Sequence, residues 1–141
     1  MSDLYEDDIV LWSERQAELL RRVAAGEPVN EAPDWPNIVE EIESVGREQR
    51  HAVESLLLQA LIHALKAARW PLAGAVPHWQ AEARVFRAQA RRRFAPSMRQ
   101  TIDLAGIFAD ALRGLPETID GLAPLPIQTE MPTLDELLSD D

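Results

Sequence analysis

The stretch that decides the fold begins Trp35-Pro36-Asn37-Ile38-Val39-Glu40-Glu41-Ile42-Glu43-Ser44-Val45-Gly46-Arg47. After Pro36 no proline occurs before Pro71, so nothing in the covalent chain interrupts a helix over this stretch. Pro36 itself falls in the first turn, where its missing N–H costs little. We therefore predict one long central helix over residues 35–69, about 50 Å long at about 1.5 Å per residue.

The first half of this helix has two distinct faces. At about 100° per residue, one mainly apolar face holds Ile38, Ile42, Val45, Gln49, Ala52, Val53 and Leu56. The opposite face carries the charged line Glu43, Arg47, Arg50 and Glu54. Its spacing predicts Glu43–Arg47 and Arg50–Glu54 ion pairs, each worth about 0.2–0.5 kcal/mol on an exposed helix. A structural role is sufficient to explain this line.

The second half is apolar in nearly every direction, which predicts a central place in a helical bundle. Between residues 56 and 68 the only polar positions are Gln59, His63 and Lys66, which share one narrow strip. This strip continues the face that is apolar in the first half. Either the buried face rotates midway along the helix, or three polar groups point inward. A solvated strip, an internal hydrogen-bond cluster and a ligand site are the three interpretations.

Shorter helices are predicted on both sides of the central one. Residues 4–25 have apolar side chains at helical spacings and form the first helix. Residues 73–77 form a loop, and a third helix runs from His78 or Trp79 to about Phe94. Its polar side presents a candidate basic face of Arg84, Arg87, Arg91 and Arg92.

A fourth helix is predicted from Met98 to Leu112. Ser97 with Gln100 resembles a capping box at its start, and Gly114 suits its end. Residues 116–132 contain four prolines and are expected to be extended. Residues 133–139 then form a short docked helix, opened by a second capping box. The fold class is therefore all-α: one domain over residues 1–141, with about four helices around the long central one.

Composition limits the class of protein. The chain has 141 residues, 46% of them hydrophobic, which suits one domain with a sizeable core. The absence of cysteine excludes disulfides, thiolate metal ligands and cysteine nucleophiles. No apolar run approaches the roughly 18 residues that a membrane span requires. The acidic N-terminus is unlike a secretory signal, so we expect a cytoplasmic protein that does not contact membranes.

The net charge of −10 is unevenly distributed. Residues 66–99 carry eight Lys and Arg against Glu82 alone, a balance of +7. The segments before and after them have balances of −9 and −8. We expect the basic segment to be neutralised mainly by the protein itself. Binding of nucleic acid through the third helix is an alternative, which the acidity of the whole chain disfavours.

The sequence indicates no catalytic residue, metal site or cofactor. Nucleotide-binding and nucleophile motifs are absent. Glu48 and His51 form one Glu-x-x-His, but a carboxylate-bridged di-iron site needs two such motifs and two further glutamates. A metal site with fewer ligands, drawn from His51, His63 and Glu40 or Glu43, stays an alternative.

The segment from Asn37 to Arg47, followed by Arg50 and by His63-Ala64-Leu65-Lys66, resembles a bacterial family known as domain of unknown function 29. Further positions fit the same pattern in order: Leu4-Tyr5-Glu6-Asp7-Asp8, Trp12, Trp79, Arg87, Pro96-Ser97-Met98 and Pro132-Thr133-Leu134-Asp135-Glu136-Leu137-Leu138. The resemblance covers nearly the whole chain. It implies an all-helical fold with no assigned activity and supplies no catalytic residues. The Ala-Pro-Asp-Trp-Pro start of the central helix and the proline-rich connection before Thr133 depart from the pattern.

Three function hypotheses follow. The first is a small helical interaction or regulatory module without catalytic activity, which binds a protein partner or a second copy of the chain. The second is a ligand-binding or metal-binding protein, conceivably an enzyme, that uses Gln59, His63 and Lys66. The third is a nucleic-acid-binding protein that uses the Arg-rich third helix. The first requires only helical surface, which this chain has in abundance.

Overall fold

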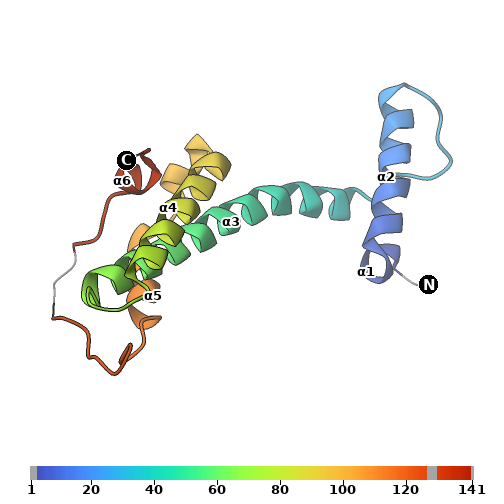
Figure 1. The fold of residues 1–141 in the computed structure, drawn as a ribbon. Coiled ribbons are helices and arrows are strands. Elements are labelled where there is room, and N and C mark those ends of the chain that lie inside the picture. Colours follow the sequence, from blue (N-terminus) through green and yellow to red (C-terminus); the bar gives the residue numbers. More distant parts are fainter. Residues whose placement is uncertain (1–2, 127–129, 141) are drawn as a thin grey trace. The chain divides into compact units, whose positions relative to one another are not determined.

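The computed structural model describes residues 3–126 and 130–140 (Figure 1). Its elements are α1 (Leu4–Asp7), α2 (Ile9–Ala24), α3 (Trp35–Arg69), α4 (Val76–Arg93), a 3-10 turn η1 (Pro96–Gln100), α5 (Leu104–Arg113) and α6 (Leu134–Leu138). Within the described ranges there is no strand, only an isolated bridge between Ile119 and Leu122. The all-α prediction is confirmed.

The contacts of the chain group into two compact units, residues 1–47 and residues 48–141. We call them the N-terminal unit and the C-terminal unit and describe each by itself. The first part of α3 belongs to the N-terminal unit and the remainder to the C-terminal unit. The single domain expected over residues 1–141 stays a prediction.

The long central helix forms as predicted. α3 begins at Trp35 with Pro36 in its first turn, and ends at Arg69, two residues before Pro71. In the N-terminal unit its buried side chain is Ile38. In the C-terminal unit its buried side chains recur at helical spacing and are Val53, Leu57, Ala60, Leu61 and Leu65.

The N-terminal unit contains a helix break that the sequence did not predict. Residues 4–25 form two helices rather than one, because Asp8 leaves helical geometry with φ −153° and ψ 87°. Its side chain accepts a hydrogen bond from the Leu11 N–H at 3.0 Å and thereby caps α2. Asp3 caps α1 in the same way, accepting from the Tyr5 N–H at 3.1 Å. The prediction of one helix over residues 4–25 was wrong at residue 8.

A small polar network holds the N-terminal unit together. Asp34, just before α3, accepts hydrogen bonds from Trp12 Nε1 at 3.0 Å and from Asn37 Nδ2 at 2.8 Å. Its backbone N–H donates to Oε1 of the buried Gln16 at 2.7 Å. The bonds from Asn37 and Trp12 lower the pKa of the Asp34 carboxyl, because they stabilise its charged form. α2 is thus attached to the start of α3 through charge-assisted hydrogen bonds.

Two helix starts in the C-terminal unit differ from prediction. α4 begins at Val76 rather than His78 or Trp79, because Pro77 fits the first turn of a helix and does not end the preceding loop. The helix predicted over residues 98–112 is also corrected. Residues 96–100 form the turn η1, and α5 starts only at Leu104 because Asp103, not Ser97, caps it. Gly114 ends α5 as predicted.

The core of the C-terminal unit lies where α4, α5 and α6 surround the second half of α3 (Figure 1). It is one apolar cluster of Val53, Leu57, Leu61, Leu65, Ala90, Met98, Ile107, Ala111 and Leu137. A second cluster, formed by Trp70, Ala73 and Trp79, closes the α3–α4 connection. Burial of large apolar side chains is the main source of stability here.

The segment after α5 is fixed to the end of α3 before it reaches α6. Ile119 and Leu122 exchange backbone hydrogen bonds around a tight turn, in which Asp120 and Gly121 have positive φ. Trp70 Nε1 donates to the Leu122 carbonyl at 2.9 Å. The extended segment predicted over residues 116–132 therefore contains one reverse turn, and its residues 127–129 lie outside the described ranges. The short helix predicted near the C-terminus is present as α6.

Candidate functional site

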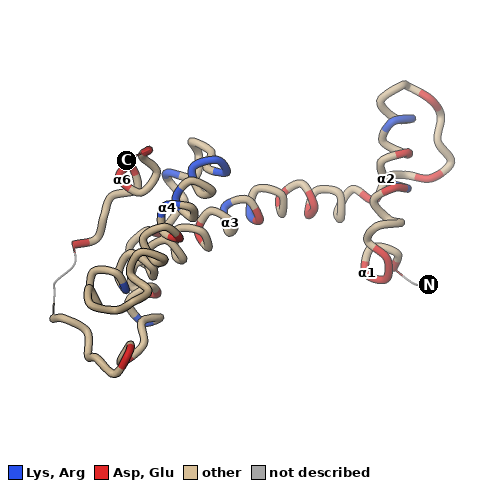
Figure 2. The backbone as a smooth tube through the Cα atoms, in the orientation of Figure 1, with Lys and Arg blue, Asp and Glu red and all other residues tan. Residues whose placement is uncertain are grey.

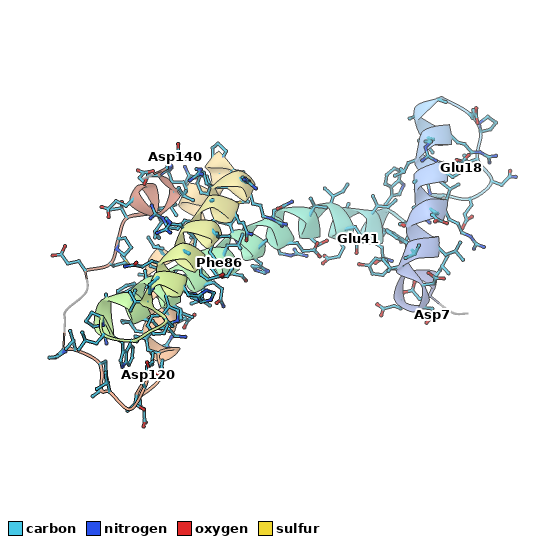
Figure 3. All side chains as sticks on the ribbon, viewed as in Figure 1. Asp7, Glu18, Glu41, Phe86, Asp120 and Asp140 are labelled. Carbon is cyan, nitrogen blue, oxygen red and sulfur yellow. The ribbon has the colours of Figure 1, made fainter. Side chains whose placement is uncertain are left out.

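The predicted polar strip on α3 lies along the side of the helix near α4. Gln59 is exposed, while His63 and Lys66 are half-buried. His63 Nδ1 lies 2.7 Å from the Gln59 carbonyl oxygen, and its ring centroid is 5.4 Å from that of Phe86. Phe86 lies on α4 (Figure 3). Lys66 Nζ lies 5.9 Å from the ring centroid of Trp79. Aromatic rings of α4 thus contact His63 and Lys66 of the strip, and Gln59 contributes its backbone carbonyl to the contact with His63.

The predicted charged line on α3 consists of ion pairs at the helix surface. Arg47 lies 3.9 Å from Glu43 and 2.7 Å from Glu40, and Arg50 lies 3.1 Å from Glu54. The Glu40 contact was not predicted, because the two residues are seven positions apart. The two Arg47 pairs are exposed and contribute about 0–1 kcal/mol each, whereas Arg50 and Glu54 are half-buried.

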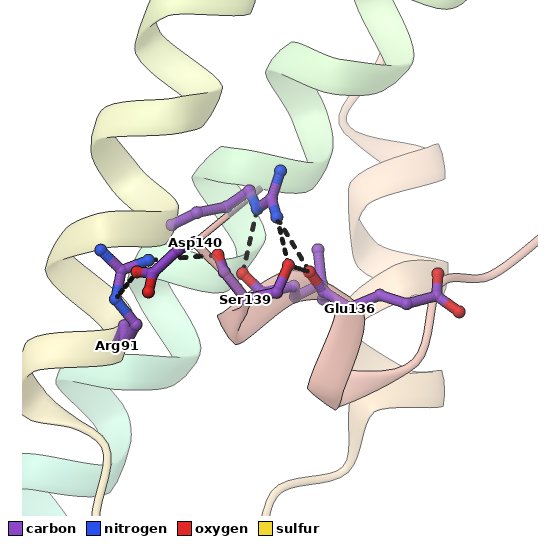
Figure 4. A network of polar contacts seen from close by, with 6 residues as sticks. Arg91, Glu136, Ser139 and Asp140 are labelled. Atoms are coloured by element: carbon purple, nitrogen blue, oxygen red, sulfur yellow. Dashed lines mark hydrogen bonds and ion pairs between the residues drawn. The ribbon is translucent and has the colours of Figure 1, made fainter.

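The predicted basic face on α4, where arginines are concentrated in Figure 2, contacts residues 136–140 of the same chain. Arg87 donates to the carbonyls of Leu137 at 3.0 Å and Glu136 at 2.8 Å, and to the Ser139 hydroxyl at 3.3 Å. Arg91 donates to the Ser139 carbonyl and pairs with Asp140, each at 3.1 Å (Figure 4). Arg84 and Arg92 are exposed.

The reason for this contact is the unsatisfied C-terminal end of α6. The last carbonyls of a helix have no intrahelical donors, and a guanidinium can satisfy several of them at once. Leu137 meanwhile inserts into the apolar cluster and is 7% exposed. Arg99 adds an ion pair of 2.7 Å to Asp135. We call this arrangement the C-terminal clamp.

A cavity of about 540 Å³ lies beside the clamp, within the C-terminal unit. Small residues of α3 and α4, among them Ala60, Ala64 and Ala83, line it. Its polar and charged lining residues are Arg87, Glu130, Glu136 and Ser139. Its volume is in the range of small-molecule sites. Arg87 is already donating to backbone carbonyls of α6, so its guanidinium is engaged in holding the chain.

An apolar surface is exposed in the N-terminal unit. Four apolar side chains of α3 are about half exposed or more: Trp35 at 50%, Val39 at 49%, Ile42 at 68% and Val45 at 62%. At about 100° per residue they fall within about 120° of arc on one side of the helix. We call them the exposed α3 face. Treating Ile42 and Val45 as part of a buried stripe with Ile38 was wrong.

The face is uncovered because the rest of the unit packs beside it. Tyr5 donates its hydroxyl to Glu41 Oε1 at 2.6 Å, which attaches α1 to the neighbouring side of α3. This bond to the carboxylate raises the pKa of Tyr5 to about 12. Together with the Asp34 network it attaches the N-terminal helices to the start of α3, where Ile38 is buried and Ile42 is exposed. Trp35 and Val39 were missed as surface residues, because spacing alone shows which side chains share a side and not what covers them.

The described ranges contain no cluster of metal ligands and no helix that could cross a membrane. No group of three or more His, Asp or Glu side chains there is placed to hold a metal ion. No helix in residues 3–126 or 130–140 combines the length and the apolar character needed to cross a membrane.

Comparison with known proteins places the chain in a family. Residues 4–141 match the family described as Domain of unknown function DUF29. A crystal structure of an alpha-helical protein of unknown function from Rhodospirillum rubrum ATCC 11170 is similar, with a TM-score of 0.60 and 23% sequence identity over 100% of this chain and 92% of that one. At that identity the similarity shows the fold. No curated protein matches the chain. The match to the family extends over nearly the whole sequence, and the chain belongs to the DUF29 family.

Proposed function

We propose that this protein is a helical interaction module that binds a partner protein through the exposed α3 face. The observation that carries the proposal is the exposure of Ile42 and Val45, at 68% and 62%, on one side of a helix with Val39. Single exposed apolar side chains are ordinary, whereas a contiguous apolar patch is characteristic of an interaction site.

The spacing of the face suits recognition of another helix or a groove. Trp35, Val39, Ile42 and Val45 occur at intervals of four, three and three, the pattern of anchors in helix-in-groove complexes. Covering each Val or Ile side chain fully would contribute about 1.5–3 kcal/mol. Trp35 belongs to the residue type most enriched among energetic anchors of interfaces.

The other two functions receive less support from the geometry. Gln59 is exposed, His63 contacts the backbone of its own helix and Lys66 lies over the Trp79 ring, so the strip has a structural explanation without a ligand. Arg87 and Arg91 are occupied with the C-terminal clamp, so half of the predicted basic face already has an acceptor within the chain. The exposed α3 face has no such partner among the described residues.

Site-specific photocrosslinking tests the proposal. Benzoylphenylalanine replaces Ile42 in the full chain, and in a control it replaces Glu14, which is exposed on α2. Adducts are identified by mass spectrometry, and each adduct protein is then purified and titrated against the unmodified chain. We expect an adduct specific to position 42.

Binding of that purified protein should weaken about a hundredfold in the Ile42→Ser/Val45→Ser variant, because each lost contact is worth at least about 1.4 kcal/mol, or one factor of ten. If the adduct is a dimer of the chain, light scattering measures whether the double substitution dissociates that dimer. Equal adducts from positions 42 and 14, or an affinity unchanged by the double substitution, would refute the proposed function.

A further inference from the structure

The exposed α3 face is bordered by acidic residues. Glu41 and Glu43 adjoin Ile42 in sequence and therefore lie about 100° to either side of it around the helix. The Glu43 side chain is 60% exposed. Arg47 approaches Glu43, but its shorter contact is the 2.7 Å pair with Glu40. Both borders of the apolar face thus carry a carboxylate.

The N-terminal unit as a whole also carries a negative net charge. Residues 1–47 contain 12 Asp and Glu against 4 Arg, a balance of −8. The acidic positions are distributed over α1, α2 and the first part of α3 (Figure 2). A partner that approaches this unit therefore meets a negative potential, which accelerates and strengthens association with a positively charged surface.

Gly46 adds a steric argument for a helical partner. It lies on the same side of α3 as Val39 and Ile42, and a Cβ atom there would have no neighbour within 4 Å. Packing within the chain thus gives no reason for a glycine, although glycine inside a helix is unfavourable relative to alanine. A glycine on an apolar helix face allows the backbone of a second helix to approach closely.

From these observations we infer that the partner's binding element is a basic amphipathic helix, with an apolar stripe flanked by Lys or Arg on both sides. This inference rests on the proposed function and names the chemistry of the partner. The apolar stripe covers Val39, Ile42 and Val45, and the flanking cations face Glu41 and Glu43. A second copy that used the same face would instead bring two units of balance −8 and their acidic borders together.

Three synthetic helical peptides test this chemistry. They share one apolar stripe of Leu and Ala at helix spacing and differ only in the flanking positions, which are Lys, Gln or Glu. Binding of each fluorescently labelled peptide to the full chain is followed by anisotropy at two salt concentrations. We expect the Lys peptide to bind at least tenfold more tightly than the Gln peptide, the Glu peptide to bind most weakly, and the Lys peptide to weaken as salt is raised.

Matched variants distinguish binding at the exposed α3 face from general electrostatic attraction to an acidic chain. Glu41→Gln/Glu43→Gln should weaken binding of the Lys peptide about tenfold, and Gln at position 41 keeps an acceptor for Tyr5. Glu14→Gln/Glu27→Gln makes the same change in charge at exposed positions away from the face and should have little effect. Ile42→Ser/Val45→Ser should reduce binding to the background level. Circular dichroism verifies that each variant is folded.

Each outcome decides between the two proposals. If the peptides bind equally and Ile42→Ser/Val45→Ser still abolishes binding, the interaction function stands and the basic partner is refuted. The same holds if light scattering shows a dimer that this double substitution dissociates. If the Lys peptide binds with no dependence on Ile42 and Val45, or if it does not bind, the inference is overturned, and the photocrosslinks at position 42 decide the proposed function independently.

Discussion

The two units of this molecule are stabilised by different means, although one helix belongs to both. The C-terminal unit buries a continuous apolar cluster around Leu57, Leu61 and Leu65 and closes it with α6. The N-terminal unit buries Trp12 and Ile38 and relies on hydrogen bonds to Asp34 and Glu41. In the C-terminal unit the apolar side of α3 is covered, whereas in the N-terminal unit most of it remains exposed. Under the proposed function, the C-terminal unit provides stability and the N-terminal unit provides the binding surface.

The largest effect is expected from the core of the C-terminal unit. Leu57 is 0% exposed, so Leu57→Ala should lower the free energy of unfolding by about 2–5 kcal/mol through lost burial and a residual cavity. Denaturant unfolding followed by circular dichroism measures it. Gln59→Ala, two residues along the same helix and exposed, serves as the control and should change the value by less than about 0.5 kcal/mol.

The C-terminal clamp should be the next most sensitive feature. Arg87→Ala removes a charged donor from the carbonyls of Glu136 and Leu137, and we expect a loss of about 1.5–3 kcal/mol. Hydrogen exchange of the α6 amides should increase at the same time. Arg92→Ala, at an exposed site one turn further along α4, should leave both quantities unchanged. Equal effects from the two substitutions would exclude a specific role for Arg87.

In the N-terminal unit, Gly46→Ala should stabilise the protein. A methyl group at this position meets open space, and alanine favours a helix over glycine by about 0.5–1 kcal/mol. The denaturant concentration at the midpoint of unfolding should therefore increase. A destabilised variant would mean that Gly46 is closely packed within the chain, contrary to its exposed position.

The smallest effect is spectroscopic and concerns Tyr5, the one tyrosine in the sequence. Its absorbance at 295 nm should titrate with a pKa of about 12 instead of 10.0, because the neutral hydroxyl donates to Glu41. The pKa is raised in the folded state, so the stability that this bond contributes is present below pH 10 and is lost as pH rises through about 12. Glu41→Ala should return the value toward 10.0. A wild-type pKa near 10 in the folded protein would contradict the bond.

The sequence was sufficient to predict the long helix and the fold class, since Pro36 and Pro71 limit α3 and its periodicity is strong. It did not locate the break at Asp8 or the cap of α5 at Asp103. An aspartate that caps a helix and an aspartate within one have the same side chain, and only backbone geometry distinguishes them.

The candidate site was harder to predict than the fold. Arg87 and Arg91 could be chosen as a basic face, but their acceptors include backbone carbonyls of α6, which no sequence pattern marks. Ile42 and Val45 were assigned correctly to an apolar side of α3, but their exposure depends on where α1 and α2 pack. Periodicity predicts which residues share a side, and tertiary contacts decide whether that side is covered.

The central claim is that the exposed α3 face serves binding and not folding. Its most direct test is the free energy of unfolding of the Ile42→Ala/Val45→Ala variant, measured by denaturant titration of the full chain. Because both side chains are more than half exposed and alanine favours helix, we predict a value within about 0.5 kcal/mol of the wild type, or slightly higher. A loss of about 2 kcal/mol or more per residue, as expected for buried side chains, would show that the face is packed within the molecule and would contradict the claim.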